Sequence, residues 1–381
     1  MKKLLLFTFI DAFGWELLKK HSFLDDVLKT KAPIETIFGY SATCDPTIIT
    51  GQLPRDHGHF SFFVHDPVSS PFKTAKMLSI LPEFITRRGR VRNQISKFYK
   101  KYLGYTGYFQ LYNMPFRTLN LYDYTEKRDI YEPGGINSGA ETIFDRLRRE
   151  RIPYYLSDWR AGEKFNLATL EQKLNQGQIK FAYLYLAAMD ATLHAHGTKS
   201  EKVSAKIAWY DGQLRRILDL AAQKFDQVDF YVFSDHGMTD VHSKCDLMKR
   251  MKELPLRQNR DYAVVYDSTM ARFWFMNDRA RNEIIESLKK CDQGRILDQA
   301  TLHDWGCDFV DGKYGQLFFL INPGVLLCPS YMGETMLAGM HGYDPKDPDS
   351  TAMFASNTEM AETPFRLDKI FNLMNRQLDS L

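Results

Sequence analysis

The sequence predicts an α/β fold with a doubly wound, mainly parallel sheet flanked by helices. The first indication is a set of three apolar runs, "LLLFTFID", "FAYLYLAAMD" and "VDFYVFSD". Each run stays apolar for about 6 to 8 residues, which is typical of strands buried on both faces of a parallel sheet. The second indication is that helical patterns over 138–151 and 204–225 alternate with these runs. Alternation of strands and helices is the pattern of doubly wound sheets.

Each apolar run ends in a carboxylate, at Asp11, Asp190 and Asp235. Ligands of doubly wound sheets bind in the crevice at the carboxyl ends of the strands. We therefore expect all three aspartates to face that crevice. A further strand is predicted in "IPYYLSDW", which follows the first helical pattern.

The N-terminal stretch "MKKLLLFTFID" imitates a signal peptide, but its apolar part lasts only from Leu4 to Ile10 and no small-x-small cleavage site follows. It is predicted to be the first strand. No run of about 18 consecutive apolar residues occurs, so we predict no transmembrane helix. The five cysteines form no CxxC pair, and an odd, scattered set indicates reduced thiols and a cytoplasmic location.

Length and composition describe an ordinary globular protein. At 381 residues we expect a single catalytic domain over 1–381 that carries insertions. A hydrophobic content of 44% and a charged content of 25% argue against disorder or a fibrous repeat. The formal charge of +3 is too small to indicate nucleic-acid binding, and none is predicted.

Two segments break the alternation of strands and helices. We interpret about 67–137 as an inserted cap and about 246–335 as a second insert within the core. The cap is basic and rich in tyrosine, so Arg87, Arg88 and Arg90 are candidates for binding a phosphate-bearing substrate. The same segment would also suit peripheral contact with anionic lipid. A merely solvated basic face is the alternative.

Histidines accompany the strand-end aspartates. Asp190 and His194 stand four residues apart, His236 follows Asp235 directly, and "MHGYD" supplies His341. Any one of these residues has an ordinary explanation, such as a helix cap or a surface histidine. Together with Asp11 they make six carboxylate and imidazole groups, the usual ligands of divalent metals such as zinc. The sequence therefore predicts that two ions bind at one edge of the sheet.

A hydroxyl nucleophile is predicted in "FGYSATCDPTIITGQLPRDHGHFSFF", residues 38–63. Ser41 and Thr43 both lie after a glycine and before a predicted helix, where unpaired backbone N–H groups favour an anion. Either hydroxyl is placed to attack phosphorus beside a metal ion.

These motifs together identify a family resemblance. "FIDAFGW", "GYSATCDPTIITGQLPRDHGH", "DATLHAHG", "FSDHGM" and "MHGYDP" occur in the order shown by the alkaline phosphatase superfamily. They most closely resemble its nucleotide pyrophosphatase/phosphodiesterase branch, and the resemblance covers the core but not the cap. It implies an alkaline phosphatase-like fold. It also implies two ions, typically Zn²⁺, with Mn²⁺ or Mg²⁺ in some members.

The resemblance also assigns residue roles. It gives one ion to Asp190, His194 and His341, and the other to Asp11, Asp235, His236 and the nucleophile. In relatives, the nucleophile lies nine residues before the threonine of a Thr-Gly pair. The same count back from Thr50 gives Ser41 as the nucleophile. Relatives place a proline two residues after the nucleophile, whereas Pro46 lies five after Ser41, so Thr43 remains the alternative. His196, two residues past His194, is a candidate substrate contact. An asparagine that binds the phosphoryl oxygen in nucleotide-hydrolysing relatives has no counterpart in "HFSFFVHD", which weakens the expectation of a nucleotide substrate.

The implied activity is that of a metal-dependent phosphodiesterase or pyrophosphatase. It would act on a small phosphate ester through a covalent phosphoseryl, or phosphothreonyl, intermediate. A phosphomonoesterase or phosphotransferase of the same superfamily is the enzymatic alternative. An inactive binding module that keeps the fold is the alternative from another class.

Overall fold

The computed structural model describes residues 2–80 and 88–381. A six-stranded sheet forms the centre of the molecule, with the strand order β2-β16-β7-β1-β6-β5. Strands β7, β1, β6 and β5 run parallel, whereas β16 is antiparallel to both of its neighbours. The sheet is therefore mixed but mainly parallel, and the predicted fold class is confirmed. The strand bounds are β1 (Lys3–Ile10), β2 (Thr30–Ile34), β5 (Tyr154–Leu156), β6 (Phe181–Leu186), β7 (Gln227–Phe233) and β16 (Ala352–Ser356).

The three apolar runs form the three adjacent strands β7, β1 and β6, whose side chains are buried on both faces of the sheet. In β1, Leu4 and Leu6 join one hydrophobic cluster, while Leu5, Phe7 and Phe9 join another on the opposite face. Burial of such a side chain stabilises the fold by about 1.5–3 kcal/mol. This two-sided burial explains why these strands are continuously apolar.

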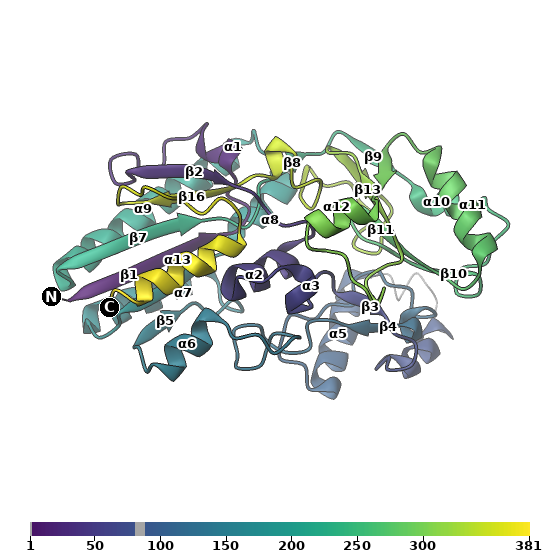
Figure 1. Ribbon diagram of the computed structural model, residues 1–381, viewed down its shortest axis with the longest axis horizontal. Helices are drawn as coiled ribbons and strands as arrows, with labels where there is room; N and C mark the ends of the chain where they lie inside the picture. The colour runs from purple at the N-terminus through teal and green to yellow at the C-terminus, as the bar shows by residue number, and fades with distance from the viewer. Residues whose placement is uncertain (1, 81–87) are drawn as a thin grey trace.

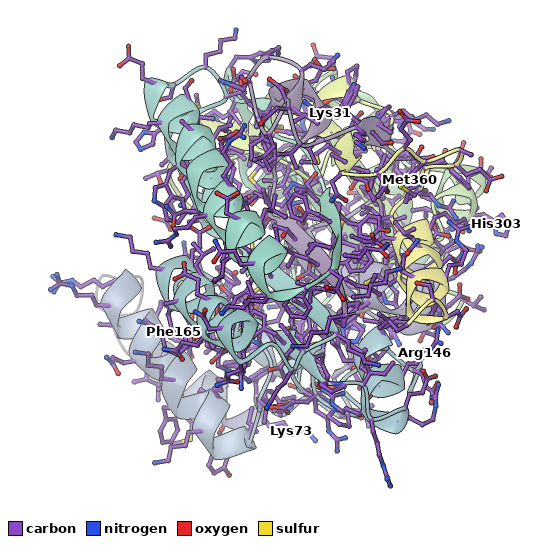
Figure 2. The ribbon with its side chains drawn as sticks, turned by 90° about the vertical axis from the view of Figure 1, so that its left-hand side faces the viewer. Lys31, Lys73, Arg146, Phe165, His303 and Met360 are labelled. Atoms are coloured by element: carbon purple, nitrogen blue, oxygen red, sulfur yellow. The ribbon has the colours of Figure 1, made fainter. Side chains whose placement is uncertain are left out.

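Helices cover both faces of the sheet (Figure 1). On one face α7 (Glu163–Gln176) and α9 (Glu201–Lys224) pack their apolar side chains into the cluster around Leu4. On the other face lie α2 (Ser41–Thr50), α6 (Ile143–Arg149) and α13 (Asp368–Leu378). Arg146, labelled in Figure 2, ties two of these helices together, because its guanidinium donates hydrogen bonds to Asn375 and Asp379 at the end of α13.

Much of the two segments that the sequence analysis interprets as inserts packs together into a second lobe. The segment 67–137 contains η1 (Lys73–Ile80), α5 (Gly89–Leu103), η2 (Leu119–Leu121) and β4 (Tyr122–Tyr124), which pairs with β3 (Phe63–His65). The segment 246–335 contains a separate antiparallel sheet, β10-β11-β13-β12, with bounds β10 (Tyr262–Tyr266), β11 (Met270–Phe275), β12 (Gly294–Ile296) and β13 (Leu317–Ile321). Phe72 and Leu111 of the first segment share a hydrophobic cluster with Val264 and Phe273 of the second. The lobe lies beyond the carboxyl ends of β1 and β7 (Figure 1).

The remaining elements are short. They are α1 (Trp15–Leu18), α3 (Pro54–His57), α8 (Ala188–His196), β8 (Thr239–Asp240), β9 (Ser243–Cys245), α10 (Leu247–Lys252), α11 (Asp278–Lys289), α12 (Gln299–Asp304), β14 (Val325–Leu327), β15 (Gly339–Met340) and η3 (Pro348–Ser350). All five cysteines are buried and free. In the described part of the chain, no helix combines the length and the apolar character needed to cross a bilayer.

Candidate metal centre and its cavity

The carboxyl ends of the central strands bring the predicted acidic groups together. Asp11 directly follows β1, and Asp235 stands two residues beyond β7. Asp190 differs from the prediction: β6 ends at Leu186, and Asp190 lies in the first turn of α8. The reason is that the alanines after Leu186, which are strong helix formers, begin the helix early. This placement puts Asp190 and His194 one turn apart on the same face of α8.

The first group of ligand-type residues is Asp11, Asp235 and His236, whose candidate ligand atoms all lie within 4.8 Å of one another. His236 Nε2 is 3.0 Å from Asp235 Oδ2 and 3.8 Å from Asp11 Oδ1. The Ala12 N–H donates to the other Asp235 oxygen, and the Tyr185 hydroxyl donates to the other Asp11 oxygen. Among the described residues, no hydrogen bond reaches Asp11 Oδ1 or Asp235 Oδ2. Each carboxylate is thus held by one oxygen and presents the other.

The second group is Asp190, His194 and His341, whose ligand atoms also lie within 4.8 Å of one another. Asp190 Oδ1 is 3.2 Å from His194 Nε2 and 3.5 Å from His341 Nε2. This Asp190 oxygen is also buried without a hydrogen bond within the described ranges. The two groups are contiguous, because the rings of His236 and His341 stack with centroids 3.8 Å apart.

Backbone carbonyls orient two of the imidazoles. His236 Nδ1 is 2.8 Å from the Gly237 carbonyl oxygen, and His194 Nδ1 is 2.8 Å from that of Gly339. An Nδ1–H that donates to a carbonyl leaves the Nε2 lone pair free, which is the arrangement of metal-binding histidines. Both free lone pairs face the aspartates.

The pKa shifts show that, without a cation, the ionised form of Asp11 and the protonated form of His341 are disfavoured. Burial, followed by the charges of Asp235 and Asp190, raises the pKa of Asp11 well above its usual range. Burial and the neighbouring His236 lower the pKa of His341. A dication removes both costs, because it stabilises ionised carboxylates and binds neutral imidazole nitrogen. The donor set therefore fits a pair of cations.

Ser41 is the hydroxyl at this centre. It is the first residue of α2, and its Oγ lies 3.3 Å from His236 Nε2. Thr43 is completely buried and donates its hydroxyl to the Phe60 carbonyl oxygen at 2.5 Å. Pro46 lies inside α2, which continues to Thr50. A proline there removes one helical hydrogen bond without ending the helix.

The candidate substrate contacts from the sequence lie elsewhere. His196 is exposed, and its Nε2 is 3.4 Å from Lys202 Nζ, because two residues along α8 place it away from the face that carries His194. Arg88 and Arg90 are exposed at the start of α5, and neither lines the cavity at the centre. Arg87 lies outside the described residues.

A cavity of about 540 Å³ opens onto Ser41, Asp190, His194 and His341. The second lobe and the core both supply its wall, including residues that the sequence analysis did not single out: Asp45, Phe62, Tyr108, Tyr112, Glu126, Tyr131, Trp159 and Asp267. Asp45 was detectable, because it stands one helical turn after Ser41. The others come from segments without a periodic or motif signal.

Comparisons with known proteins bear on the family and the fold of the chain. Residues 5–344 match the family model of type I phosphodiesterase/nucleotide pyrophosphatase. No curated protein sequence shows a significant match. Human ectonucleotide pyrophosphatase/phosphodiesterase 5 aligns with a TM-score of 0.70 at 15% identity, over 99% of this chain and 95% of that one. The murine protein, in an inactive form in complex with AMP, aligns with a TM-score of 0.71 at 16% identity, over 100% of this chain and 95% of that one. At such identities the structural likeness establishes the fold alone.

Proposed function

Because the chain belongs to the type I phosphodiesterase/nucleotide pyrophosphatase family, we propose that it hydrolyses phosphoric diesters at a two-cation centre with Ser41 as the nucleophile. The observation that carries this proposal is the pair of adjacent aspartate and histidine groups. Three of their carboxylate oxygens lack a hydrogen bond within the described residues, and the Ser41 Oγ lies 3.3 Å from His236 Nε2 of one group.

The residues present fit two divalent cations. Asp190, His194 and His341 would hold one, and Asp11, Asp235, His236 and Ser41 would hold the other. Mixed carboxylate and imidazole donors suit zinc, with Mn²⁺ or Mg²⁺ as alternatives. When bound, such ions lower the pKa of a hydroxyl and stabilise negative charge on a departing oxygen.

Ser41 performs the covalent step. Its Oγ forms a bond to phosphorus, the bond from phosphorus to the leaving alcohol breaks, and the serine proton is lost to solvent while the departing alkoxide takes one up. Water then cleaves the phosphoseryl ester, which regenerates Ser41 and releases the monoester. The backbone N–H groups at the start of α2 favour the phosphate at this position. Thr43 holds the Phe60 loop through its hydrogen bond.

The test compares Ser41→Ala with Thr43→Val on bis-p-nitrophenyl phosphate. We expect Ser41→Ala to lower kcat/KM by at least about 10³-fold, the size of effect typical for loss of a nucleophile. Thr43→Val should retain most of the turnover, because its hydroxyl only bonds the backbone. Acid-quenched wild-type enzyme should carry one phosphoryl adduct on the peptide that contains Ser41. A Ser41→Ala variant as active as wild type rejects the assignment.

Two competing functions are separated by simple measurements. A phosphomonoesterase or phosphotransferase would turn over p-nitrophenyl phosphate faster than the diester. An inactive binding module would hold near-zero divalent metal by mass spectrometry and would show no turnover after zinc is added. We favour an enzyme over a binding module because both ligand groups are present among the described residues, and a diesterase because of the family.

Contact with anionic lipid is a separate part of the proposal. Helix α5 has no acidic residue and exposes Phe98 and Tyr102 beside Lys97 and Lys101. Figure 2 shows this helix at the lower left margin of the molecule, with its side chains extending outward. Such a face suits an anionic bilayer surface. Sedimentation with phosphatidylserine vesicles, but not with phosphatidylcholine vesicles, is expected, and Lys97→Glu with Lys101→Glu should abolish it.

A further inference from the structure

Backbone groups hold three of the candidate metal ligands, Asp235, His236 and His194, in place. Asp11 differs, because a side chain holds it: the Tyr185 hydroxyl donates a hydrogen bond to Asp11 Oδ2 at 2.7 Å. Over residues 2–80 and 88–381, no other side chain from outside the two ligand groups and Ser41 makes a hydrogen bond to one of their members. The effect of Tyr185 on the centre can therefore be isolated by one substitution.

Strand pairing places Tyr185 beside Asp11. In the parallel pairing of β1 with β6, Phe9 stands opposite Tyr185. Side chains two residues apart point to the same face of a strand, so Asp11 follows Phe9 on the side of the sheet that carries Tyr185. The rings of Phe9 and Tyr185 stack with centroids 4.8 Å apart. This stacking and the strand register together hold the hydroxyl at Asp11.

The hydrogen bond determines which oxygen of Asp11 faces the other ligands. An ionised carboxylate only accepts hydrogen bonds, and a bond of 2.7 Å from a hydroxyl to such a group is charge-assisted and strong. With Oδ2 held, Oδ1 is the oxygen left without a hydrogen bond within the described residues, 3.8 Å from His236 Nε2. Without the hydroxyl, the carboxylate would be free to rotate about its Cβ–Cγ bond, whose torsion has broad minima.

We propose that Tyr185 is a positioning residue for the cation of the first group, Asp11 with Asp235 and His236, and that it does not act on the cation of the second group. This inference rests on the proposed two-cation centre. Hydrogen-bond partners of metal ligands typically contribute about 10–100-fold to metal affinity. Because Tyr185 bonds to Asp11 alone, its loss should weaken one cation of the two. A hydroxyl that only stabilised the fold would show no such selectivity.

Tyr183 offers a matched control. It lies two residues before Tyr185 in β6, on the same face of the strand, and is 1% exposed. Its hydroxyl makes no hydrogen bond to any described residue. Tyr183→Phe and Tyr185→Phe therefore remove the same atom from the same strand, but only the second removes a bond to Asp11.

The first test measures zinc binding and needs no turnover. Metal-free protein is titrated with Zn²⁺ in competition with a chromogenic chelator. We expect two ions per chain in wild type and in Tyr183→Phe. Tyr185→Phe should bind one ion about 10–100-fold more weakly and the other with unchanged affinity. Unchanged affinity for both ions overturns the inference, as does an equal loss for both or a wild-type chain that binds fewer than two.

Combined variants identify which ion is weakened. In a His341→Ala background, which damages the second group, Tyr185→Phe should still lower the affinity for the remaining ion by about 10–100-fold. In an Asp235→Asn background, which damages the first group, Tyr185→Phe should not change the affinity for the remaining ion. The reverse pattern overturns the inference.

The second test follows turnover of bis-p-nitrophenyl phosphate at a series of free Zn²⁺ concentrations. Tyr185→Phe should need about 10–100-fold more zinc than wild type for half-maximal turnover, and excess zinc should restore its rate. An unchanged half-maximal zinc concentration overturns the inference and leaves the diesterase in place. Selective loss of one ion in Tyr185→Phe, with no turnover by wild type, would support the inference and reject the proposed diesterase.

Discussion

Two buried acidic sites of this molecule are equally hidden from solvent but differ in how they are paired. Asp267 is 2% exposed, and its Oδ2 accepts from Arg272 Nε at 2.8 Å. The Arg272 guanidinium also donates to the Phe63 and Tyr314 carbonyl oxygens and to Ser61 Oγ. Asp235 is 0% exposed, yet its Oδ2 faces only His236 and carries no hydrogen bond within the described residues.

This difference separates a structural site from a functional one. The Arg272 pair links β11 to the backbone of β3 and of the Tyr314 loop, and it needs nothing from outside. The carboxylates at the ends of β1 and β7 are left open on one oxygen, although burial of a bare charge is costly. An open oxygen of this kind supports the proposal that a cation binds there.

The largest effect is expected when Asp235, which has one carboxylate oxygen without a hydrogen bond, is changed. Asp235→Asn removes one charged donor and should lower kcat/KM on bis-p-nitrophenyl phosphate by about 10⁴-fold, or roughly 5.5 kcal/mol. The stability of the metal-free protein should stay equal or rise, because Asp235 repels Asp11 and raises its pKa. Kinetics and thermal unfolding in chelator check both parts. A variant that keeps its activity, or that unfolds at much lower temperature, would contradict the distinction.

The paired site, Asp267 with Arg272, should instead lose stability when one partner is changed. Asp267→Asn leaves the Arg272 charge buried without its counter-ion, and breaking a buried pair on one side costs about 3–5 kcal/mol. Urea unfolding of the metal-free protein measures the loss. The double variant Asp267→Leu with Arg272→Met removes both charges and should recover most of it. If the single variant is as stable as wild type, the pair does not hold the second lobe.

The sequence predicts the open site far better than the closed one. Short motifs carry Asp190 with His194, and Asp235 with His236, and the buried strands together with α8 place them at one edge of the sheet. The Arg272 pair gives no such signal, because its partners come from 61–63, 267 and 314 and meet only in the folded lobe.

Other features were also beyond the reach of sequence patterns. The antiparallel direction of β16 follows from the path of the C-terminal chain. The aromatic cavity wall combines Phe62, Tyr108 and Tyr112 with Trp159 from the core, which no periodicity connects. Strand register and lobe packing decide these contacts, and both depend on long-range burial.

Removal of metal by a chelator should also distinguish the Asp235 site from the Asp267 site. A ligand present at 100 times its dissociation constant stabilises the folded state by about 2.7 kcal/mol. Chelation should therefore abolish turnover of wild type and lower its unfolding temperature. The same drop is expected for Asp267→Asn, whose metal ligands are intact. Asp235→Asn should show a much smaller drop. A chelator effect of equal size in Asp235→Asn would place the cations elsewhere.

Glu126 represents a third state, a half-buried carboxylate for which no ion pair forms within the described residues, and the dependence of stability on pH should reveal it. Burial raises its pKa from 4.5 to about 8. Because the folded value is the higher one, the stability that Glu126 contributes is complete below about pH 4.5 and is lost as pH rises toward 8. Glutamine does not titrate, so the stability of Glu126→Gln should rise relative to that of wild type by up to about 3.5 kcal/mol between pH 5 and pH 8. Urea midpoints of the ligand-free proteins at both pH values test this, with Glu359→Gln as the control that should show no change. A constant difference between Glu126→Gln and wild type would mean that the charge of Glu126 is already compensated in the folded protein.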